Sequence, residues 1–356
     1  MCSKQKYSVI LLKNEPQNYD SDFLICGRTS EEWMKQVCGE NFGGVVDACE
    51  DLKQAITPFL TDCLYTFVIN SLCPLITRDT LRDVAEYLSS TGKDAVRLTA
   101  GYAFKTSSFD SIEFCGNLPS AFFDEEDFLA VTNAKILSFA SSVLKTRINN
   151  ALLQKGVIMP DPSAVYIDGT AEIETGAVIY PGNYIYGGSR IGKGTTLFPG
   201  CIIKDTVIGE NCTITSLHSD RAVIGCSAAV GPNVNLRPGA VIGDNTRIGN
   251  FVEIKNAKIG SGTKVAHLSY IGDAVLGENC NVGCGTVFAN YNGKIKQKTV
   301  VGDRVFIGCN ANLVAPLEIG DDVLIAAGST VTRDIPSNAM AIARPKQENK
   351  ENYMKK

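Results

Sequence analysis

The sequence lacks the long apolar runs and the excess of one charge that mark several large protein classes. It contains no run of about 18 apolar residues, which excludes a conventional transmembrane helix. A formal net charge of −4 over 356 residues offers no basic surface for nucleic acid or for membrane lipid. The apolar stretch at residues 8–12 is shorter than the apolar core of a signal peptide. We therefore expect a cytoplasmic protein that binds neither nucleic acid nor membranes.

Cysteine is plentiful, but its spacing does not suit a metal site. There are thirteen Cys, an odd number, with no Cys-x-x-Cys pair and with neither of the two His nearby at ligand spacing. This pattern disfavours a disulfide framework and a zinc site, and it favours a reducing compartment. Cys280 and Cys284 are the closest pair, and buried thiols are the favoured interpretation there. No metal site is predicted.

Residues 1–155 are expected to form an α/β domain. Apolar runs predict strands over residues 7–12 and 64–69. Helices are predicted over residues 31–38, 77–88 and about 125–153, with Asp79 and Thr80 as candidate caps of the second. Asp161-Pro162 breaks the chain and marks the change of domain.

From Ile167 onward, aliphatic residues recur mostly every six positions, with a few steps of five and two longer ones. This period predicts a solenoid shaped as a triangular prism, in which three six-residue units form one coil and like residues stack about every 18 residues. The fold would be a left-handed parallel β-helix over residues 156–345, followed by a basic tail over 346–356. The anchors include Ile173, Ile185, Ile214, Ile224, Leu236, Ile254, Val265, Val282, Phe288, Val301, Ile307 and Val331.

Two longer departures from this period are candidate functional loops. One lies between Ile214 and Ile224 and holds His218, for which a structural role is favoured. The other lies between Phe288 and Val301 and is the better candidate, because loops on a rigid scaffold commonly carry function. A solvated charged loop is the alternative. Its polar residues are Asn290, Tyr291, Lys294, Lys296 and Lys298.

Long motifs within the repeats resemble one family. They read LRPGA from Leu236, IGNFVEIK from Ile248, AHLSYIGD from Ala266, NVGCGT from Asn281 and NYNG from Asn290. Together they are similar to the acetyltransferase half of the bifunctional enzyme that makes UDP-N-acetylglucosamine for cell-wall synthesis. The resemblance covers roughly residues 155–345. It implies a homotrimer that transfers acetyl from acetyl-CoA to the amine of glucosamine 1-phosphate.

The resemblance also implies a role for individual residues. His267 matches the general base of the family. The positions that match sugar-phosphate contacts are Arg237, Lys255, Tyr270, Asn281 and Lys296, with Glu253 in the same polar cluster. The positions that match acetyl-CoA contacts are Cys284, Asn290, Tyr291, Cys309, Ala327 and Arg344. Cys309 stands where the family commonly has Ser, and Cys284 where it commonly has Ala.

The residue chemistry agrees with these roles. A sugar ammonium must lose a proton before it attacks a thioester, and imidazole is a suitable acceptor near neutral pH. A phosphate dianion needs several cations. The alternatives are a structural wall residue for His267 and a solvated terminus for Arg344.

Residues 1–155 resemble a shortened uridyltransferase domain of the same enzyme that has lost its chemistry. Residues 13–18 after the first strand contain no Gly and include a Pro, so they do not suit a phosphate-binding loop. Leu72 and Thr132 stand where the family has metal ligands, and Leu cannot bind Mg²⁺. We expect no uridyl transfer. Two other hypotheses stay open: another acyl group or amino-sugar phosphate as substrate, and a non-catalytic partner of a separate uridyltransferase.

Overall fold

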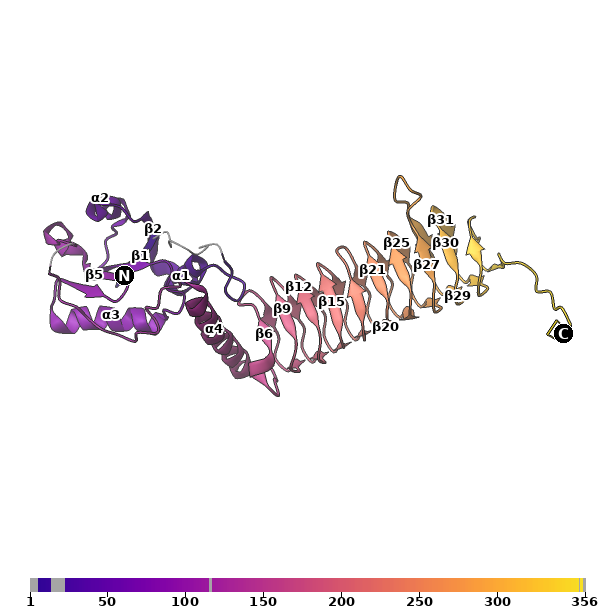
Figure 1. The fold of residues 1–356 in the computed structure, drawn as a ribbon, viewed down its shortest axis with the longest axis horizontal. Coiled ribbons are helices and arrows are strands. Elements are labelled where there is room, and N and C mark those ends of the chain that lie inside the picture. The colour runs from indigo at the N-terminus through magenta and orange to yellow at the C-terminus, as the bar shows by residue number, and fades with distance from the viewer. Residues whose placement is uncertain (1–5, 14–22, 115–116, 352, 355–356) are drawn as a thin grey trace, which may run out of the picture. The chain divides into compact units, whose positions relative to one another are not determined.

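The computed structural model describes residues 6–13, 23–114, 117–351 and 353–354 (Figure 1). The chain divides into two compact units, residues 1–147 and 148–356. The division falls inside helix α4 (Ala134–Gln154), whereas the sequence predicts the change of domain near residue 155. Most of the segment 13–18 considered above lies outside the described residues.

The first unit is built on a five-stranded sheet of order β2-β1-β3-β5-β4. Strands β1, β2 and β3 run parallel, β5 is antiparallel to β3, and β4 is antiparallel to β5. The strands expected over residues 7–12 and 64–69 are confirmed as β1 and β3, and the α/β class with them. The bounds are β1 (Tyr7–Lys13), β2 (Phe42–Asp47), β3 (Tyr65–Asn70), β4 (Ala95–Leu98) and β5 (Gly101–Lys105).

The helices differ from the expectation mainly at their starts. Thr77 caps α3 by accepting a hydrogen bond from the Thr80 amide, so the expected caps at Asp79 and Thr80 were wrong. Helix α4 begins at Ala134 after an Asn133 side chain that accepts from two backbone amides, so residues 125–133 are not part of it. The bounds are α1 (Ser30–Cys38), α2 (Leu52–Ile56) and α3 (Arg78–Thr91), with 3₁₀ turns at Gly39–Asn41, Thr57–Phe59, Thr106–Ser111 and Pro162–Ala164.

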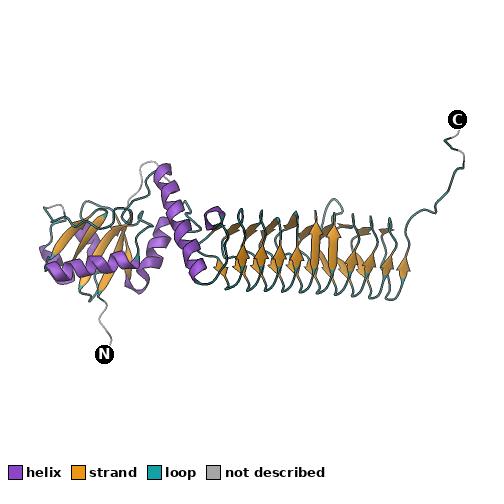
Figure 2. Ribbon diagram, turned by 90° about the horizontal axis from the view of Figure 1, so that it is seen from below, coloured by secondary structure: helices purple, strands orange, loops and turns teal. Residues whose placement is uncertain are grey.

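The second unit is a left-handed parallel β-helix of about ten turns with three sheets (Figure 2). Sheet I contains β7 (Glu172–Ile173), β10 (Arg190–Ile191), β13 (Val207–Ile208), β16 (Val223–Ile224), β19 (Val241–Ile242), β22 (Lys258–Ile259), β25 (Ala274–Leu276), β28 (Thr299–Val301) and β31 (Leu317–Ile319).

Sheet II contains β8 (Val178–Ile179), β11 (Thr196–Leu197), β14 (Thr213–Ile214), β17 (Ala229–Val230), β20 (Arg247–Asn250), β23 (Lys264–His267), β26 (Asn281–Val282), β29 (Phe306–Ile307), β32 (Leu324–Ile325) and β34 (Met340–Ala341). Sheet III contains β6 (Tyr166–Ile167), β9 (Tyr184–Tyr186), β12 (Ile202–Lys204), β15 (Leu217–Asp220), β18 (Val234–Leu236), β21 (Glu253–Lys255), β24 (Tyr270–Gly272), β27 (Val287–Ala289), β30 (Asn312–Val314) and β33 (Thr330–Val331).

The aliphatic anchors fill the inside of the prism, as predicted. Those named above are at most 8% exposed, and they belong to one continuous hydrophobic core. Parallel registers such as Arg190 with Glu172 and Tyr270 with Glu253 place successive coils 18 or 17 residues apart. Burial of these side chains stabilises the scaffold by roughly 1.5–3 kcal/mol for each large residue.

One of the two expected loops is a strand instead. Residues 217–220 form β15, which pairs with β12 and β18 in sheet III. Ser219 takes the inward position where other coils have an aliphatic residue. The six-residue pattern of aliphatic residues is therefore interrupted here, although the coil itself continues. The second departure does leave the prism: the chain after β27 projects as a loop before it re-enters at β28 (Figure 1).

Among the described residues, each helix is too short or too polar to span a lipid bilayer.

Candidate functional site

A polar cluster occupies the outer surface of sheet III beside the projecting loop. The register aligns Glu253 of β21 with Tyr270 of β24, and both side chains point away from the core. Arg237 follows β18 and donates to the Glu253 carboxylate at 2.9 Å. That hydrogen bond raises the pKa of Arg237. The parallel ladder thus brings residues 33 positions apart onto one small surface.

Two lysines lie next to one another at the edge of this cluster. Lys255 ends β21, and Lys296 comes from the loop between β27 and β28. Hydrogen bonding with Lys255 and the like charge of Lys255 lower the pKa of Lys296, whereas the nearby Asp273 carboxylate acts in the opposite direction. Neither lysine takes part in an ion pair among the residues that the structure describes. Two neighbouring cations with one nearby carboxylate, that of Asp273, leave an excess of positive charge that favours a bound anion.

The start of the loop is fixed by buried hydrogen bonds. The Asn290 side chain is 8% exposed and donates to Asp273 at 2.5 Å and to the Tyr270 hydroxyl at 3.4 Å. Gly272 makes room for this arrangement, because a Cβ there would lie 2.3 Å from the Tyr270 hydroxyl. Asn290 therefore lies beside Tyr270, on the side of the cluster that carries the lysines.

A second group follows the corner between sheets II and III. His267 ends β23 and is exposed, and its backbone pairs with Asn250 of β20. In the coils beyond, the Asn310 amide donates to the Cys284 carbonyl, and the Gly328 amide donates to the Cys309 carbonyl. These bonds stack consecutive coils about 4.8 Å apart. His267, Cys284, Cys309 and Ala327 thus follow one corner of the prism.

The remaining predicted positions lie elsewhere on the β-helix. Asn281 points outward from β26 in sheet II, so one chain does not bring it together with the cluster on sheet III. Tyr291 is 61% exposed in the loop, and its hydroxyl donates to the Gly293 carbonyl. Arg344 lies beyond β34, with its Cδ 4.0 Å from where a Cβ on Gly328 would stand.

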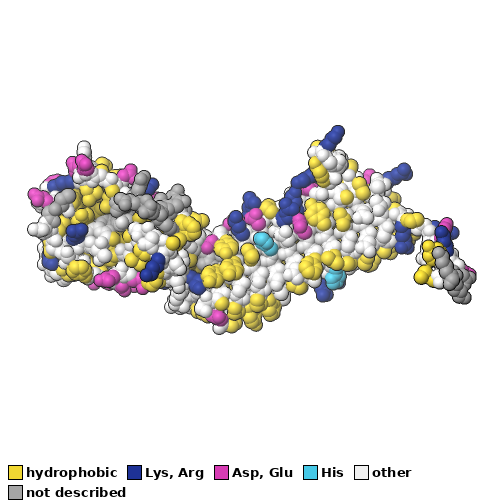
Figure 3. Space-filling view, in the orientation of Figure 1, with side chains coloured by type: hydrophobic (Ala, Val, Ile, Leu, Met, Phe, Trp, Pro, Cys, Tyr) yellow, Lys and Arg dark blue, Asp and Glu magenta, His cyan; other side chains and the backbone are white. Residues whose placement is uncertain are grey.

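A cavity of about 360 Å³ lies under the projecting loop. It is lined by Asp273 and by three loop or strand lysines, Lys258, Lys296 and Lys298, among others. Cationic side chains also stand out on the side of the β-helix that carries the loop (Figure 3). The loop and the neighbouring strands therefore form a concave, positively charged surface.

In the first unit, the carboxyl end of β3 is closed by the chain itself. Leu72 is 4% exposed, and its carbonyl accepts from the Val131 amide. The Cys73 thiol donates to Phe128, and Arg147 donates to the Leu75 carbonyl. Open α/β sheets bind ligands in the crevice at the carboxyl ends of their strands. Here residues 71–76 are buried at that position.

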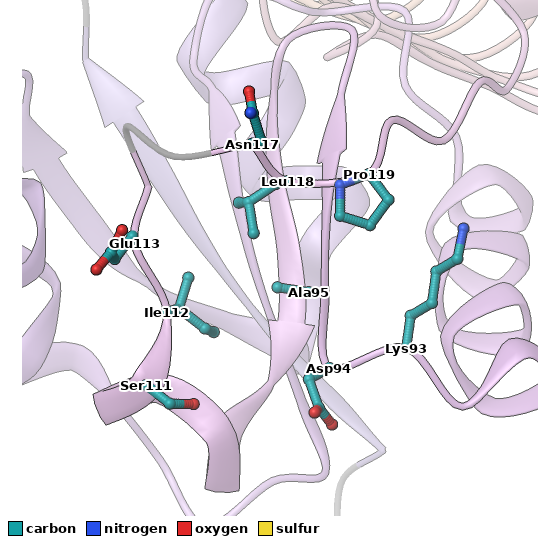
Figure 4. A pocket seen from close by; sticks show the side chains of 9 residues that line it. All are labelled: Lys93, Asp94, Ala95, Ser111, Ile112, Glu113, Asn117, Leu118 and Pro119. Atoms are coloured by element: carbon teal, nitrogen blue, oxygen red, sulfur yellow. The ribbon is translucent and has the colours of Figure 1, made fainter.

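The first unit has a cavity of about 460 Å³ at a different place. Lys93 and Asp94 precede β4, and they line this cavity with Glu113 and Pro119 (Figure 4). The cavity thus lies at the amino end of β4, away from the usual ligand crevice of such sheets.

Two protein-family models match parts of the β-helix. The family model described as the GMPPB C-terminal domain matches residues 218–305, and the model of six bacterial transferase hexapeptide repeats matches residues 298–333. The bifunctional protein GlmU of Clostridium acetobutylicum is 46% identical over 231 residues, or 65% of this chain and 51% of that protein. The chain resembles GlmU. This confirms the resemblance inferred from the motifs.

Other comparisons give the extent of this similarity. GlmU of Clostridium novyi is 42% identical over 275 residues, which cover 77% of this chain and 60% of that protein. The chain spans about half the length of the GlmU proteins it matches. A solved Arabidopsis UDP-N-acetylglucosamine acyltransferase aligns with 52% of this chain over 65% of its own length, at 20% identity and a TM-score of 0.34.

Sequence reasoning missed Gly272, Asp273 and Asn256. The first two stand inside a quoted motif, yet Gly followed by Asp or Asn recurs at many corners of the prism. Asn256 donates to Asp273 at 2.6 Å, a contact between coils that no period in the sequence marks.

Proposed function

We propose that this protein transfers the acetyl group of acetyl-CoA to the amine of glucosamine 1-phosphate. The observation that supports this most is the placement of two lysines beside Tyr270: the register sets Lys255 opposite Gly272, and Lys296 stands one residue before the bond that closes the loop on Asn290. The resemblance to the acetyltransferase half of that bifunctional enzyme supports the same acceptor and donor, because the motifs that carry it include Lys255 and Tyr270.

In this proposal the phosphate of the acceptor lies against Lys255 and Lys296. Its two negative charges would replace the repulsion between the ammonium groups with charge-assisted hydrogen bonds. Arg237 contributes as well, since a guanidinium has five N–H donors and only one is engaged with Glu253. The Tyr270 hydroxyl and the side chain of Asn281 would contact the sugar.

His267 is proposed as the general base. Its imidazole is exposed and can accept a proton from the sugar ammonium. The freed amine then attacks the thioester carbonyl and forms a tetrahedral intermediate. The intermediate loses a second proton and expels the CoA thiolate, which is protonated to the thiol. Backbone amides of the coils are suitable donors to the oxyanion.

Acetyl-CoA is proposed to lie along the corner that leads away from His267. Cys284, Cys309 and Ala327 follow this corner coil by coil, and their side chains are small enough for a ligand to approach the backbone. Arg344 at the far end suits a phosphate of CoA. Tyr291, exposed in the loop, is a further donor contact.

The working form is proposed to be a homotrimer. Asn281 lies on sheet II, whereas Lys255 and Tyr270 lie on sheet III, so a second copy is needed if these residues contact the same sugar. A closed ring of three prisms would repeat one such site at each interface.

We also propose that the first unit does not transfer uridylyl groups. The segment at the carboxyl end of β3 is covered by residues 128–131, and Leu72 offers no oxygen to a metal ion. A docking role for a separate uridyltransferase remains compatible with this unit.

The test is a pair of assays on the purified protein. Acetyl transfer to glucosamine 1-phosphate is followed through the free thiol of CoA, beside a panel of other amino-sugar phosphates and other acyl-CoA thioesters. Uridyl transfer from UTP is measured on the acetylated product. We expect acetyl transfer with glucosamine 1-phosphate and acetyl-CoA as the preferred pair and no uridyl transfer; preference for another pair would refute the substrate assignment.

A further inference from the structure

Asp273 links three neighbouring coils beside the cluster. It follows β24 at the corner between sheets III and I, with a backbone φ of +49° in the left-handed region that Asp and Asn tolerate. One carboxylate oxygen accepts from Asn256 at 2.6 Å and the other from Asn290 at 2.5 Å. A carboxylate accepts from two amide groups at once, which neither an amide nor a hydroxyl in its place would do equally well.

Through Asn290, Asp273 fixes both ends of the projecting loop. The Asn290 carbonyl accepts from the Gln297 amide at 2.7 Å, so the residue that starts the loop also closes it. Lys296 stands one residue before that closing bond. The same Asn290 amide reaches the Tyr270 hydroxyl, which crosses the space left by Gly272.

From this geometry we infer that Asp273 is a positioning residue, which holds Asn290 so that Lys296 and Tyr270 face the same acceptor. Anchoring of the loop follows from the contacts alone, whereas the effect on the acceptor rests on the proposed function. The sequence motifs suggested Asn290 as a contact of the acetyl donor; the inference instead predicts that disturbing it affects the sugar phosphate.

The first test replaces Asp273→Asn and uses Asp205→Asn as a matched control. Asp205 stands at the same corner of an earlier coil, with φ +46°, and its side chain accepts from one backbone amide, that of Gly188. In the D273N variant an amide group faces Asn290 or Asn256 with the wrong polarity. The Gln297 amide proton is expected to exchange about tenfold faster than in the wild type, because a hydrogen bond to a charged group is lost. In D205N its exchange stays unchanged.

The second measurement is steady-state kinetics of acetyl transfer. D273N is expected to raise the KM for glucosamine 1-phosphate about tenfold, with less than about a twofold change in the KM for acetyl-CoA. A purely structural role would lower the thermal stability and the amount of active protein without separating the two KM values.

A swapped pair tests the hydrogen bond itself. N290D alone places two carboxylates against each other, whereas D273N/N290D restores one donor and one acceptor. Exchange at Gln297 in the double variant should return to within about twofold of the wild type.

The claim that Asp273 anchors the loop would be overturned if the Gln297 amide exchanged at the wild-type rate in D273N. It would also be overturned if this amide exchanged as fast in the double variant as in the faster single variant. Faster exchange with an unaltered KM for the sugar phosphate, or a selective rise in the KM for acetyl-CoA, would overturn the positioning role. Lack of acetyl transfer in the wild type would refute the proposed function instead, and the exchange data would still decide whether Asp273 anchors the loop.

Discussion

Lys255, at the end of β21, lowers the pKa of Lys296 through hydrogen bonding and through its like charge, and the Asp273 carboxylate opposes this shift. A phosphate bound between the two lysines favours the protonated form of Lys296. Phosphate binding is therefore strongest below the lowered pKa of Lys296, where the ammonium is already protonated. It weakens as the pH rises through that pKa. The loss of affinity occurs at a lower pH than for an isolated lysine.

This relationship predicts a specific effect of Lys255→Gln. Removing the like charge lets the pKa of Lys296 return toward its ordinary range. The alkaline rise in the KM for glucosamine 1-phosphate should then move to higher pH, although the KM itself increases. The pH dependence of the acceptor KM in wild type and K255Q tests this; a midpoint that stays or moves to lower pH would contradict it.

The two histidines of the chain make a matched pair for testing the base. His267→Ala is expected to lower kcat by about 10²–10⁴-fold, the usual contribution of a general base. His218→Ala is the control, since His218 is also exposed on the β-helix but lies on β15 of sheet III, in a coil before those that hold the cluster. Circular dichroism and particle mass should match the wild type for both. Turnover of H267A near that of H218A would remove His267 from the mechanism.

A side chain at position 272 is predicted to displace Tyr270 and Asn290. A Cβ in Gly272→Ala would lie 2.3 Å from the Tyr270 hydroxyl and 2.7 Å from the Asn290 side-chain nitrogen. Overpacking of this kind costs about 1–3 kcal/mol. We expect a lower unfolding temperature and a higher KM for glucosamine 1-phosphate.

Gly188→Ala is the control for this substitution. A Cβ on Gly188 meets nothing within 4 Å, and its backbone lies outside the left-handed region. In G188A, the unfolding temperature and the KM for glucosamine 1-phosphate should both stay close to the wild-type values. If both substitutions had equal effects, the predicted steric conflict between a side chain at position 272 and the Tyr270 hydroxyl would be contradicted.

A complementation experiment tests whether two copies share one site. Asn281→Ala and Lys255→Ala alter sheets II and III respectively, and each is expected to be nearly inactive alone. If neighbouring copies supply these residues, unfolding and refolding an equal mixture should regenerate about a quarter of the sites in random trimers. Activity no greater than that of the separate variants would place both residues of a site in the same chain.

The scaffold could be predicted from the sequence because its core repeats. Each coil buries an aliphatic residue at the same position, so Ile173, Leu236 and Ile307 mark the period directly. The prediction was wrong at 214–224, where Ser219 takes the inward position and its hydroxyl is buried without a hydrogen-bond partner among the described residues. It also missed β2, β4 and β5, which are short or rich in Gly and Ala.

The candidate site could be predicted only in part. His267, Lys255 and Lys296 could be predicted, because a His and two cations interrupt a repeat that is otherwise apolar. Their distribution over two sheets and a corner could not be inferred, because it depends on the register between coils and not on spacing along the chain. The link from Asn256 through Asp273 to Asn290 joins residues 17 positions apart at each step, and only the stacked structure reveals it.

The most direct measurement of the central claim is a crystal structure of the protein with glucosamine 1-phosphate and CoA bound together. The account predicts the phosphate against Lys255 and Lys296, the amine near a His267 imidazole, and CoA along the corner of Cys284 and Cys309. Both ligands lying far from that imidazole would contradict it.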